Sequence, residues 1–198
     1  MSTPVEEAQL YAQVGAGVLP VGTSAGTAPW AQTFDRRFAI SAVAAPASGT
    51  MNMSAIYLPA GRVVTGISYV SGSTAESGGT NLWFALYRGD TLALLAQSTN
   101  DTGAAAFAAN TMLRKALTTP QTLPITGLYY IGYCSTNSAG AQPTLVNTTS
   151  PIGNNNGVGV TGMTPVLCGT STTGLTTAAP ATAAAVVGGL INFWACVD

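Results

Sequence analysis

Charged side chains are scarce in this 198-residue chain. Six basic and seven acidic residues make up 7% of the sequence and give a net charge of −1, whereas about one quarter of a typical soluble domain is charged. An interface with nucleic acid requires clustered Lys and Arg, but only Arg36–Arg37 and Arg114–Lys115 are adjacent pairs. We therefore expect no nucleic-acid partner. Disorder is also disfavoured, because 47% of the residues are hydrophobic and disordered chains are poor in such residues.

Histidine is absent, which removes Ser-His-Asp and Cys-His catalysis and every histidine metal site. The single lysine lies outside any phosphate-binding glycine loop. A pair of carboxylates for glycoside hydrolysis would have to include Glu76, Asp90, Asp101 or the acids of the N-terminal region. These residues lie in turn-like sequence with no sign of an apolar pocket that would raise the pKa of a carboxyl group. The sequence therefore predicts a protein that is not an enzyme and needs no cofactor.

Cysteine is also rare. Cys134, Cys168 and Cys196 are odd in number and far apart, so they fit neither a disulfide framework nor a Cys-x-x-Cys metal site. We interpret them as small buried thiols of a protein made in a reducing cytosol, and we expect no bound metal.

Long apolar runs are missing as well. The most hydrophobic window, residues 183–197, is shorter than the roughly 20 residues that a membrane-spanning helix needs, and Gly188–Gly189 and Asn192 interrupt it. Near the start of the sequence, Glu6 and Glu7 stand where a signal peptide carries basic residues. We expect no membrane partner and no export by a signal peptide.

The residues that are present divide the chain near position 50. Residues 1–49 hold a short helical pattern at 5–14, followed by glycine and proline residues too closely spaced for a long element. We expect residues 1–49 to form an extended N-terminal docking arm and residues 50–198 to form a β-sandwich domain.

Alternation of apolar and polar residues begins at residue 50. This period-two pattern is typical of β-strands, whose successive side chains point to opposite faces. Arg88-Gly89-Asp90 is a turn that joins two such runs in a hairpin. Many short strands between Gly, Pro and Asn turns indicate an all-β fold, an antiparallel β-sandwich with a jelly-roll-like order. The expected strands are residues 51–57, 63–69, 82–87, 91–97, 112–117, 128–134, 144–147, 158–160, 165–168 and 190–197.

Two runs that match enzyme signatures are better explained as loops. Asp101-Thr102-Gly103 spells the Asp-Thr-Gly of aspartic proteases. However, polar residues precede it where that family has an apolar strand, and Asn and Asp are good turn residues. Residues 157–162 fit the Gly-x-Gly-x-x-Gly of dinucleotide sites, but an Asn run precedes them and Pro165 follows, so the required strand and helix are missing.

Aromatic residues are candidates for binding. Five of them lie inside the expected strands, where core packing is favoured over a sugar-stacking platform. They are Trp83, Tyr129, Tyr130, Tyr133 and Trp194. Trp30 is different because it follows Pro29 in a segment of small residues. It either anchors the arm in a partner's pocket or packs on its own sandwich.

Asp35-Arg36-Arg37 is the densest charge cluster, and Phe34, Phe38 and Ile40 around it have the spacing of a strand that begins there. The cluster is either solvated or fixes the arm by pairing with carboxylates of a neighbouring subunit. The candidate partner-binding residues are therefore Trp30, Phe34, Arg36 and Arg37.

Three elements of the central region carry a family resemblance. They are an LPAG turn at Leu58–Gly61, a WFALY strand at Trp83–Tyr87 and a GLYYIG strand at Gly127–Gly132. In this arrangement, roughly residues 50–146 resemble a β-sandwich module in virion proteins of tailed bacteriophages, especially phages of actinobacteria. The motifs are structural and bring no catalytic residues with them.

The resemblance implies a protein of the virion surface, assembled in the host cytoplasm: a head decoration protein, a head fibre or a tail-tip module. Its partners would be the major capsid protein or other virion proteins. It also implies a homo-oligomer, a trimer by analogy, and a net charge near zero favours self-association. The alternative is a receptor- or carbohydrate-binding module of a tail or head fibre that binds a host-surface glycan. Solvent exposure of Trp83, Tyr87 and Tyr129 would favour this alternative.

The longest uncharged stretch runs from Ala116 to Val197. Such a stretch is poorly suited to a free surface in water. The sequence therefore predicts that residues 116–197 contribute much of the contact surface of an assembled protein.

Overall fold

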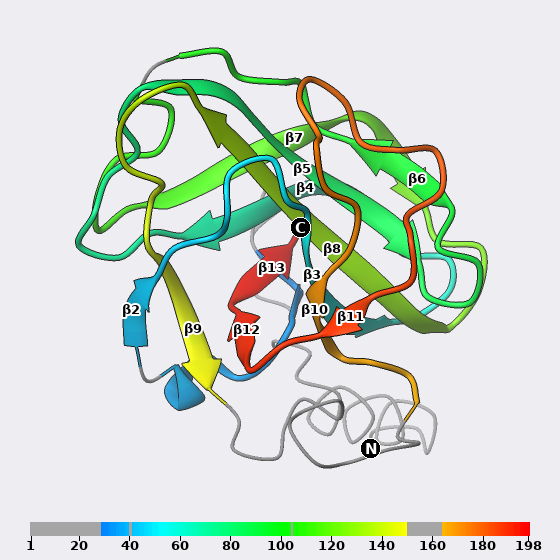
Figure 1. Ribbon diagram of the computed structural model, residues 1–198. Coiled ribbons are helices and arrows are strands. Elements are labelled where there is room, and N and C mark those ends of the chain that lie inside the picture. Colours follow the sequence, from blue (N-terminus) through cyan, green and yellow to red (C-terminus); the bar gives the residue numbers. More distant parts are fainter. Residues whose placement is uncertain (1–28, 40, 104, 150–163) are drawn as a thin grey trace.

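A computed structural model describes residues 29–39, 41–103, 105–149 and 164–198 (Figure 1). Within these residues the fold is all-β, with one short 3-10 helix, η1 (Arg36–Phe38), and no α-helix. Every strand pair is antiparallel. The predicted all-β antiparallel class is thus confirmed, and the arrangement fits a β-sandwich. The jelly-roll-like order stays a prediction.

Three sheets contain all the named strands. The six-stranded sheet has the order β11 (Val187–Gly188), β10 (Cys168–Thr170), β3 (Asn52–Leu58), β8 (Gly127–Asn137), β5 (Gly79–Arg88) and β6 (Leu94–Gln97). The four-stranded sheet has the order β1 (Ala31–Gln32), β13 (Ala195–Val197), β4 (Val63–Val70) and β7 (Met112–Thr122). The three-stranded sheet has the order β12 (Ile191–Phe193), β9 (Leu145–Thr149) and β2 (Ser41–Ala44).

The strands with the clearest alternation lie where the sequence predicts them, and β5 and β6 form the predicted hairpin, with Leu86 opposite Ala96. Two regions differ. The strand expected at 190–197 is broken at Trp194, whose amide donates to Val146 while β12 and β13 pair in different sheets. The strand expected around Asp35 is wrong, because η1 occupies this position. The expected helical pattern at 5–14, the strand at 158–160 and the glycine run at 157–162 lie outside the described residues.

Two strands before residue 50 belong to the sheets. β1 pairs with β13, and β2 pairs with β9. The boundary expected at residue 50 therefore lies between strands of the same fold. The expected arm over residues 1–28 lies outside the described residues.

The main core lies between the six- and four-stranded sheets and centres on three aromatic rings. Tyr69 of β4 lies 4.9 Å from Phe84 of β5 and 5.2 Å from Tyr133 of β8, measured between ring centroids. The pair Phe84 and Tyr133 is stacked at 5.7 Å. Such offset and edge contacts add stability beyond the burial of apolar area, and they fix how the two sheets face each other.

A second core covers the outer face of the six-stranded sheet. It contains Met51, Met53, Trp83, Tyr87 and Tyr130, all buried. Residues 164–186, called the covering segment below, are drawn in orange in Figure 1. Apart from β10, which is a strand of the sheet itself, the covering segment lies over this face, where Leu175, Ala179, Ala183 and Val186 pack on the second core. Three side chains of the sheet donate to its backbone carbonyls: Trp83 Nε1 to Thr176 at 2.7 Å, Tyr87 to Pro180 at 3.0 Å, and Tyr130 to Val166.

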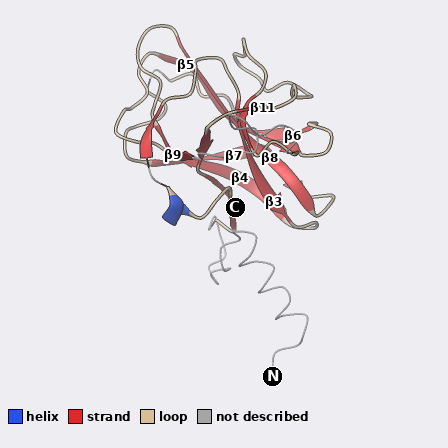
Figure 2. Ribbon diagram, turned by 60° about the horizontal axis from the view of Figure 1, so that its bottom comes forward, coloured by secondary structure: helices blue, strands red, loops and turns tan. Residues whose placement is uncertain are grey.

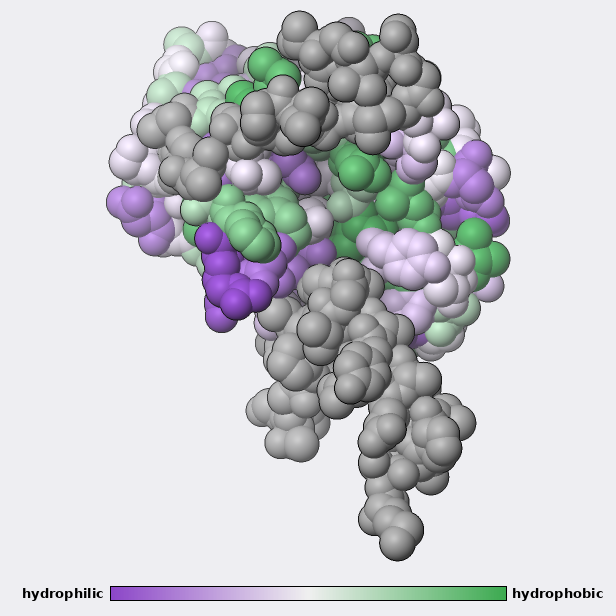
Figure 3. All heavy atoms as spheres, turned by 90° about the horizontal axis from the view of Figure 1, so that it is seen from below, coloured by the Kyte–Doolittle hydropathy of each residue, from purple (hydrophilic) through white to green (hydrophobic). Residues whose placement is uncertain are grey.

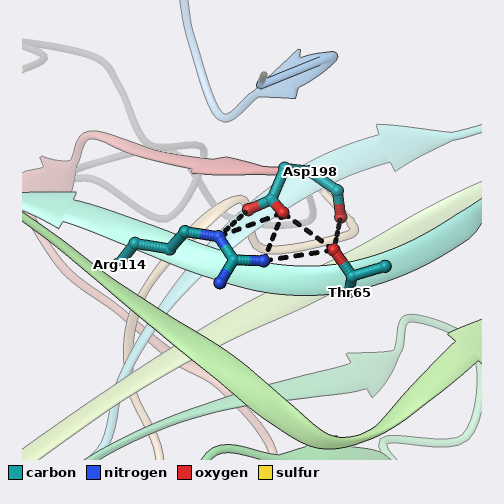
Figure 4. A network of polar contacts seen from close by, with 3 residues as sticks. All are labelled: Thr65, Arg114 and Asp198. Carbon is teal, nitrogen blue, oxygen red and sulfur yellow. Dashed lines mark hydrogen bonds and ion pairs between the residues drawn. The ribbon is translucent and has the colours of Figure 1, made fainter. Parts of the chain in front are cut away.

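A polar network fastens β13 to β4 and β7 (Figure 4). Arg114 of β7 donates to both carboxylate oxygens of Asp198, from Nε at 2.9 Å and from Nη2 at 2.6 Å. The hydroxyl of Thr65 donates to the same carboxylate at 2.8 Å. The guanidinium lies against Gly66, where a Cβ atom would come within 2.7 Å of Arg114 Cζ. The glycine is therefore what allows the arginine to reach Asp198.

We expect Arg114→Met to destabilise the protein by about 2–3 kcal/mol, because it leaves a buried carboxylate without its charged partner. The side chain of Asp198 is only 3% exposed. Urea unfolding at neutral pH measures the effect. The matched control is Arg88→Met, which breaks the surface pair with Asp90, whose side chain is 48% exposed, and this control should unfold like the parent protein. Equal effects of the two substitutions would contradict the structural role of the network.

Candidate functional site

Exposed apolar side chains gather at one end of the sandwich. We call this surface the end face and define its apolar part by Phe38, Leu167, Val187, Leu190 and Ile191. Phe38 is 65% exposed and Val187 is 67% exposed, and the other three are also exposed. Figure 3 views this end from below and shows hydrophobic (green) residues close to strongly hydrophilic (purple) ones. Large apolar side chains in such a position are typical of interaction surfaces.

Short strands at the sheet edges build the end face. β11 is only two residues long and forms the edge of the six-stranded sheet, where Val187 pairs with Thr170. The chain turns back immediately, and Gly189 donates to Cys168 at 3.1 Å. β12 follows as the edge of the three-stranded sheet, with Ile191 opposite Thr149. Two sheet edges therefore meet around one short apolar segment, 187–191.

Asp35 sets the conformation of η1, which lies beside β9 at the periphery in Figure 2. The Asp35 carboxylate caps the helix by accepting from the Arg37 amide at 3.0 Å and from Arg37 Nε at 2.9 Å. These hydrogen bonds hold the pKa of Asp35 below its usual value. Aspartate is a preferred N-cap residue, which explains the helix turn in place of a strand. Among the described residues, Arg36 has no ion-pair partner.

The strand register places η1 on the end face. η1 immediately precedes β2, and Ser41 of β2 pairs with Asn147 of β9. On the other side of β9, Asn147 pairs with Phe193 and Thr149 pairs with Ile191. Phe38 and Ile191 therefore lie at the same end of the three-stranded sheet, separated by β9.

The candidate partner-binding residues do not all lie together. Phe34, Arg36 and Arg37 lie at or next to η1, and both arginines are exposed. Trp30 is 7% exposed and belongs to the main core, with its ring 4.6 Å from Arg62 Cζ in a cation–π contact. Of the two alternatives for Trp30, the structure shows packing on its own sandwich. Sequence reasoning assigned Phe38 to a strand and missed its exposure.

The strand aromatics form no sugar-stacking surface. Trp83, Tyr87 and Tyr129 are fully buried, and Tyr130, Tyr133 and Trp194 are buried as well. Core packing, which the sequence favoured, is confirmed. The exposure that would favour a carbohydrate-binding module is not found at these positions.

The Asp101-Thr102-Gly103 run is a loop, as predicted. Asp101 Oδ1 accepts from the Gly103 amide at 2.9 Å, and Asp101 Oδ2 lies 3.7 Å from Lys115 Nζ. The expectation that Glu76 lacks apolar surroundings is wrong. Glu76 is 2% exposed, and burial raises its pKa to about 7.

The cysteines are buried thiols, as predicted. Burial raises the pKa of Cys168 to about 11 and the pKa values of Cys134 and Cys196 to about 12, so the reactive thiolate form is rare at neutral pH. In the described part of the chain, no three Cys, Asp or Glu side chains are grouped in a way that could hold a metal ion. The described residues also include no helix with the length and hydrophobicity needed to span a bilayer.

Substitutions at two aromatic positions separate core packing from surface exposure. Trp30→Ala should destabilise the fold by about 3–5 kcal/mol, because it empties a core position. Phe38→Ala should cost less than about 0.5 kcal/mol, since its ring is mostly in solvent. Chemical unfolding of both variants measures the difference. A Trp30→Ala variant as stable as the parent would refute the assignment of Trp30 to the core.

Comparison with known proteins finds neither a family model that matches the sequence nor a curated protein with significant similarity to it.

Proposed function

We propose that this chain is a non-enzymatic structural protein of a tailed-bacteriophage virion, a head decoration protein that binds the particle through its end face. The observation that carries the proposal is the end face itself, an apolar surface at one end of a nearly uncharged sandwich. The resemblance of residues 50–146 to virion β-sandwich modules supplies the biological setting.

Physical chemistry makes the end face a suitable docking surface. Burial of apolar area contributes roughly 25 cal/mol per Å², so the exposed apolar side chains of this face favour contact with a partner. Exposed aromatic and arginine residues often dominate binding energy, and Phe38, Arg36 and Arg37 adjoin one another in η1. Arg36 is available to a carboxylate or carbonyl of the partner.

The same face supports association with virion proteins and with further copies of the chain. Four of its five apolar residues lie within the uncharged stretch 116–197, which is the part expected to contribute contact surface. The major capsid protein is the proposed partner, and a trimer on the particle surface is the proposed assembly.

The alternative, a tail or head-fibre module that binds a host-surface glycan, has less support. The aromatic residues that would stack on sugar rings are buried in the two cores. No other observation on the described surface favours that alternative.

The triple variant Phe38→Ser, Val187→Ser, Leu190→Ser tests the docking surface. We expect it to bind particles that lack this protein at least about 30-fold more weakly than the parent, because the loss of apolar anchors costs 2 kcal/mol or more. Co-sedimentation with the particles over a range of protein concentrations gives the affinity.

A matched control replaces exposed apolar residues outside the end face: Tyr57→Ser, Val63→Ser, Met112→Ser. These side chains are 50%, 44% and 51% exposed, and the control should bind like the parent. Circular dichroism confirms that both variants are folded. Full binding by the end-face variant, or equal losses in both variants, would overturn the proposal.

A further inference from the structure

Glu76 is a buried carboxyl group without a counter-ion of its own. It lies in the connection between β4 and β5 and is 2% exposed. Neither carboxylate oxygen makes a well-formed hydrogen bond among the described residues, although the backbone amides of Phe107 and Ala106 lie close enough to lower its pKa. Buried polar groups are normally hydrogen-bonded, and a buried carboxylate without partners is costly. The position of Glu76 therefore calls for a physical explanation.

Three connections of the sandwich meet around this side chain, and we call the site the Glu76 junction. It comprises residues 71–78, 98–103, 105–111 and 138–144. The Glu76 amide donates to Phe107 at 2.9 Å, and the Ser77 amide donates to Ala141 at 3.0 Å. Backbone hydrogen bonds thus hold the first connection to the other two, on both sides of the carboxyl group.

The carboxyl group packs closely against the backbone of the surrounding connections. It packs directly on the backbone of Gly79, where a Cβ atom would lie 2.8 Å from both Cδ and Oε1 of Glu76. The Gly103 carbonyl closes the same space, 3.1 Å from that Cβ position. Hydration of an ionised Glu76 therefore requires the connections to move apart.

The surrounding groups do not supply a counter-ion that belongs to Glu76. Burial is the main cause that raises the pKa of Glu76, and Asp101 raises it further, whereas the backbone amides of Phe107 and Ala106 and the ammonium group of Lys115 lower it. Lys115 already lies 3.7 Å from Asp101. Tyr133 of β8, which interacts electrostatically with Glu76, is also buried, and its ring packs against Tyr69 of β4. Residues 138–144 contain no ionisable side chain.

We propose that Glu76 is a proton-controlled latch, which keeps the Glu76 junction closed while it is protonated and favours an open junction when it is ionised. The inference rests on the buried carboxyl group, which has no counter-ion of its own, and on the three connections that enclose it. It does not depend on the proposed function.

The direction of the pH effect follows from proton linkage. Burial raises the pKa of Glu76 from 4.5 to about 7 in the closed junction, whereas an open, hydrated junction leaves the pKa near its ordinary value. Protonated Glu76 therefore contributes its full stabilisation of the closed junction below about pH 4.5, and this contribution is lost as the pH rises to about 7. Above pH 7 the opening equilibrium stays constant.

Amide hydrogen exchange of the full chain, corrected for intrinsic exchange rates, tests the latch. For the Glu76 and Ser77 amides we expect the opening constant to increase by up to about tenfold per pH unit between pH 4.5 and 7 and then to level off. The paired amides of β3 and β8 should show no such dependence. In Glu76→Gln, which has a neutral side chain at every pH, the dependence should be lost.

The control Asp90→Asn removes an exposed carboxyl group and should retain the parent's profile. A carbon-13 titration of the Glu76 carboxyl in the parent protein gives a second readout that needs no variant. A Glu76 carboxyl group that titrates near pH 4.5 would overturn the proposal. So would a Glu76→Gln variant whose amide exchange depends on pH as it does in the parent. Titration near pH 7 together with a flat Glu76→Gln profile supports it.

Discussion

The six-stranded sheet is buried on both faces, and the rest of the structure follows from this constraint. An antiparallel sheet usually has one apolar and one polar face. Here Leu82, Phe84 and Leu86 of β5 face the main core, while Trp83 and Tyr87 face the second core. The four-stranded sheet packs on the inner face only, so another part of the chain has to cover the outer face of the six-stranded sheet. The covering segment, residues 164–186, has this role.

The polar atoms of the outer aromatic residues decide how the covering segment is held. A buried indole N–H or phenol O–H needs an acceptor. Trp83, Tyr87 and Tyr130 find their acceptors in backbone carbonyls of the covering segment. A segment with little regular secondary structure is thereby fixed at three separate points.

The packing of the covering segment also helps to explain why residues 116–197 include no charged side chain. The uncharged stretch 116–197 suggested a surface between subunits. For part of residues 164–186 the structure supplies a reason within one chain. Ala183 is buried on the apolar sheet, and Leu175, Ala179 and Val186 pack against it, where a charged side chain is costly to bury. Many other side chains of this segment are exposed. The proposed intermolecular role falls on Leu167, Val187, Leu190 and Ile191, the exposed large apolar side chains of residues 164–198.

Local pattern was enough to predict the strong strands but not how they associate. The alternation in β5 and β8 and the turn at Arg88–Asp90 are local properties, and they lie where they were predicted. The break at Trp194 depends on a hydrogen bond to Val146, far away in the sequence. The side-chain cap of Asp35 replaced a predicted strand with η1. That cap is a local contact, and it also explains why Phe38 is not part of a strand. Trp30 and Glu76 were left open or misjudged because their burial is set by distant residues.

β9 is the element that the end face and the Glu76 junction share. Leu145, at its first residue, is bridged to Ser71, next to the connection that carries Glu76. Thr149, at its last residue, pairs with Ile191 on the end face. The two sites therefore lie at opposite ends of one strand, and each depends on different contacts. Loss of the latch would leave the apolar residues of the end face in place. A displacement of β9 itself would change the structure of both sites.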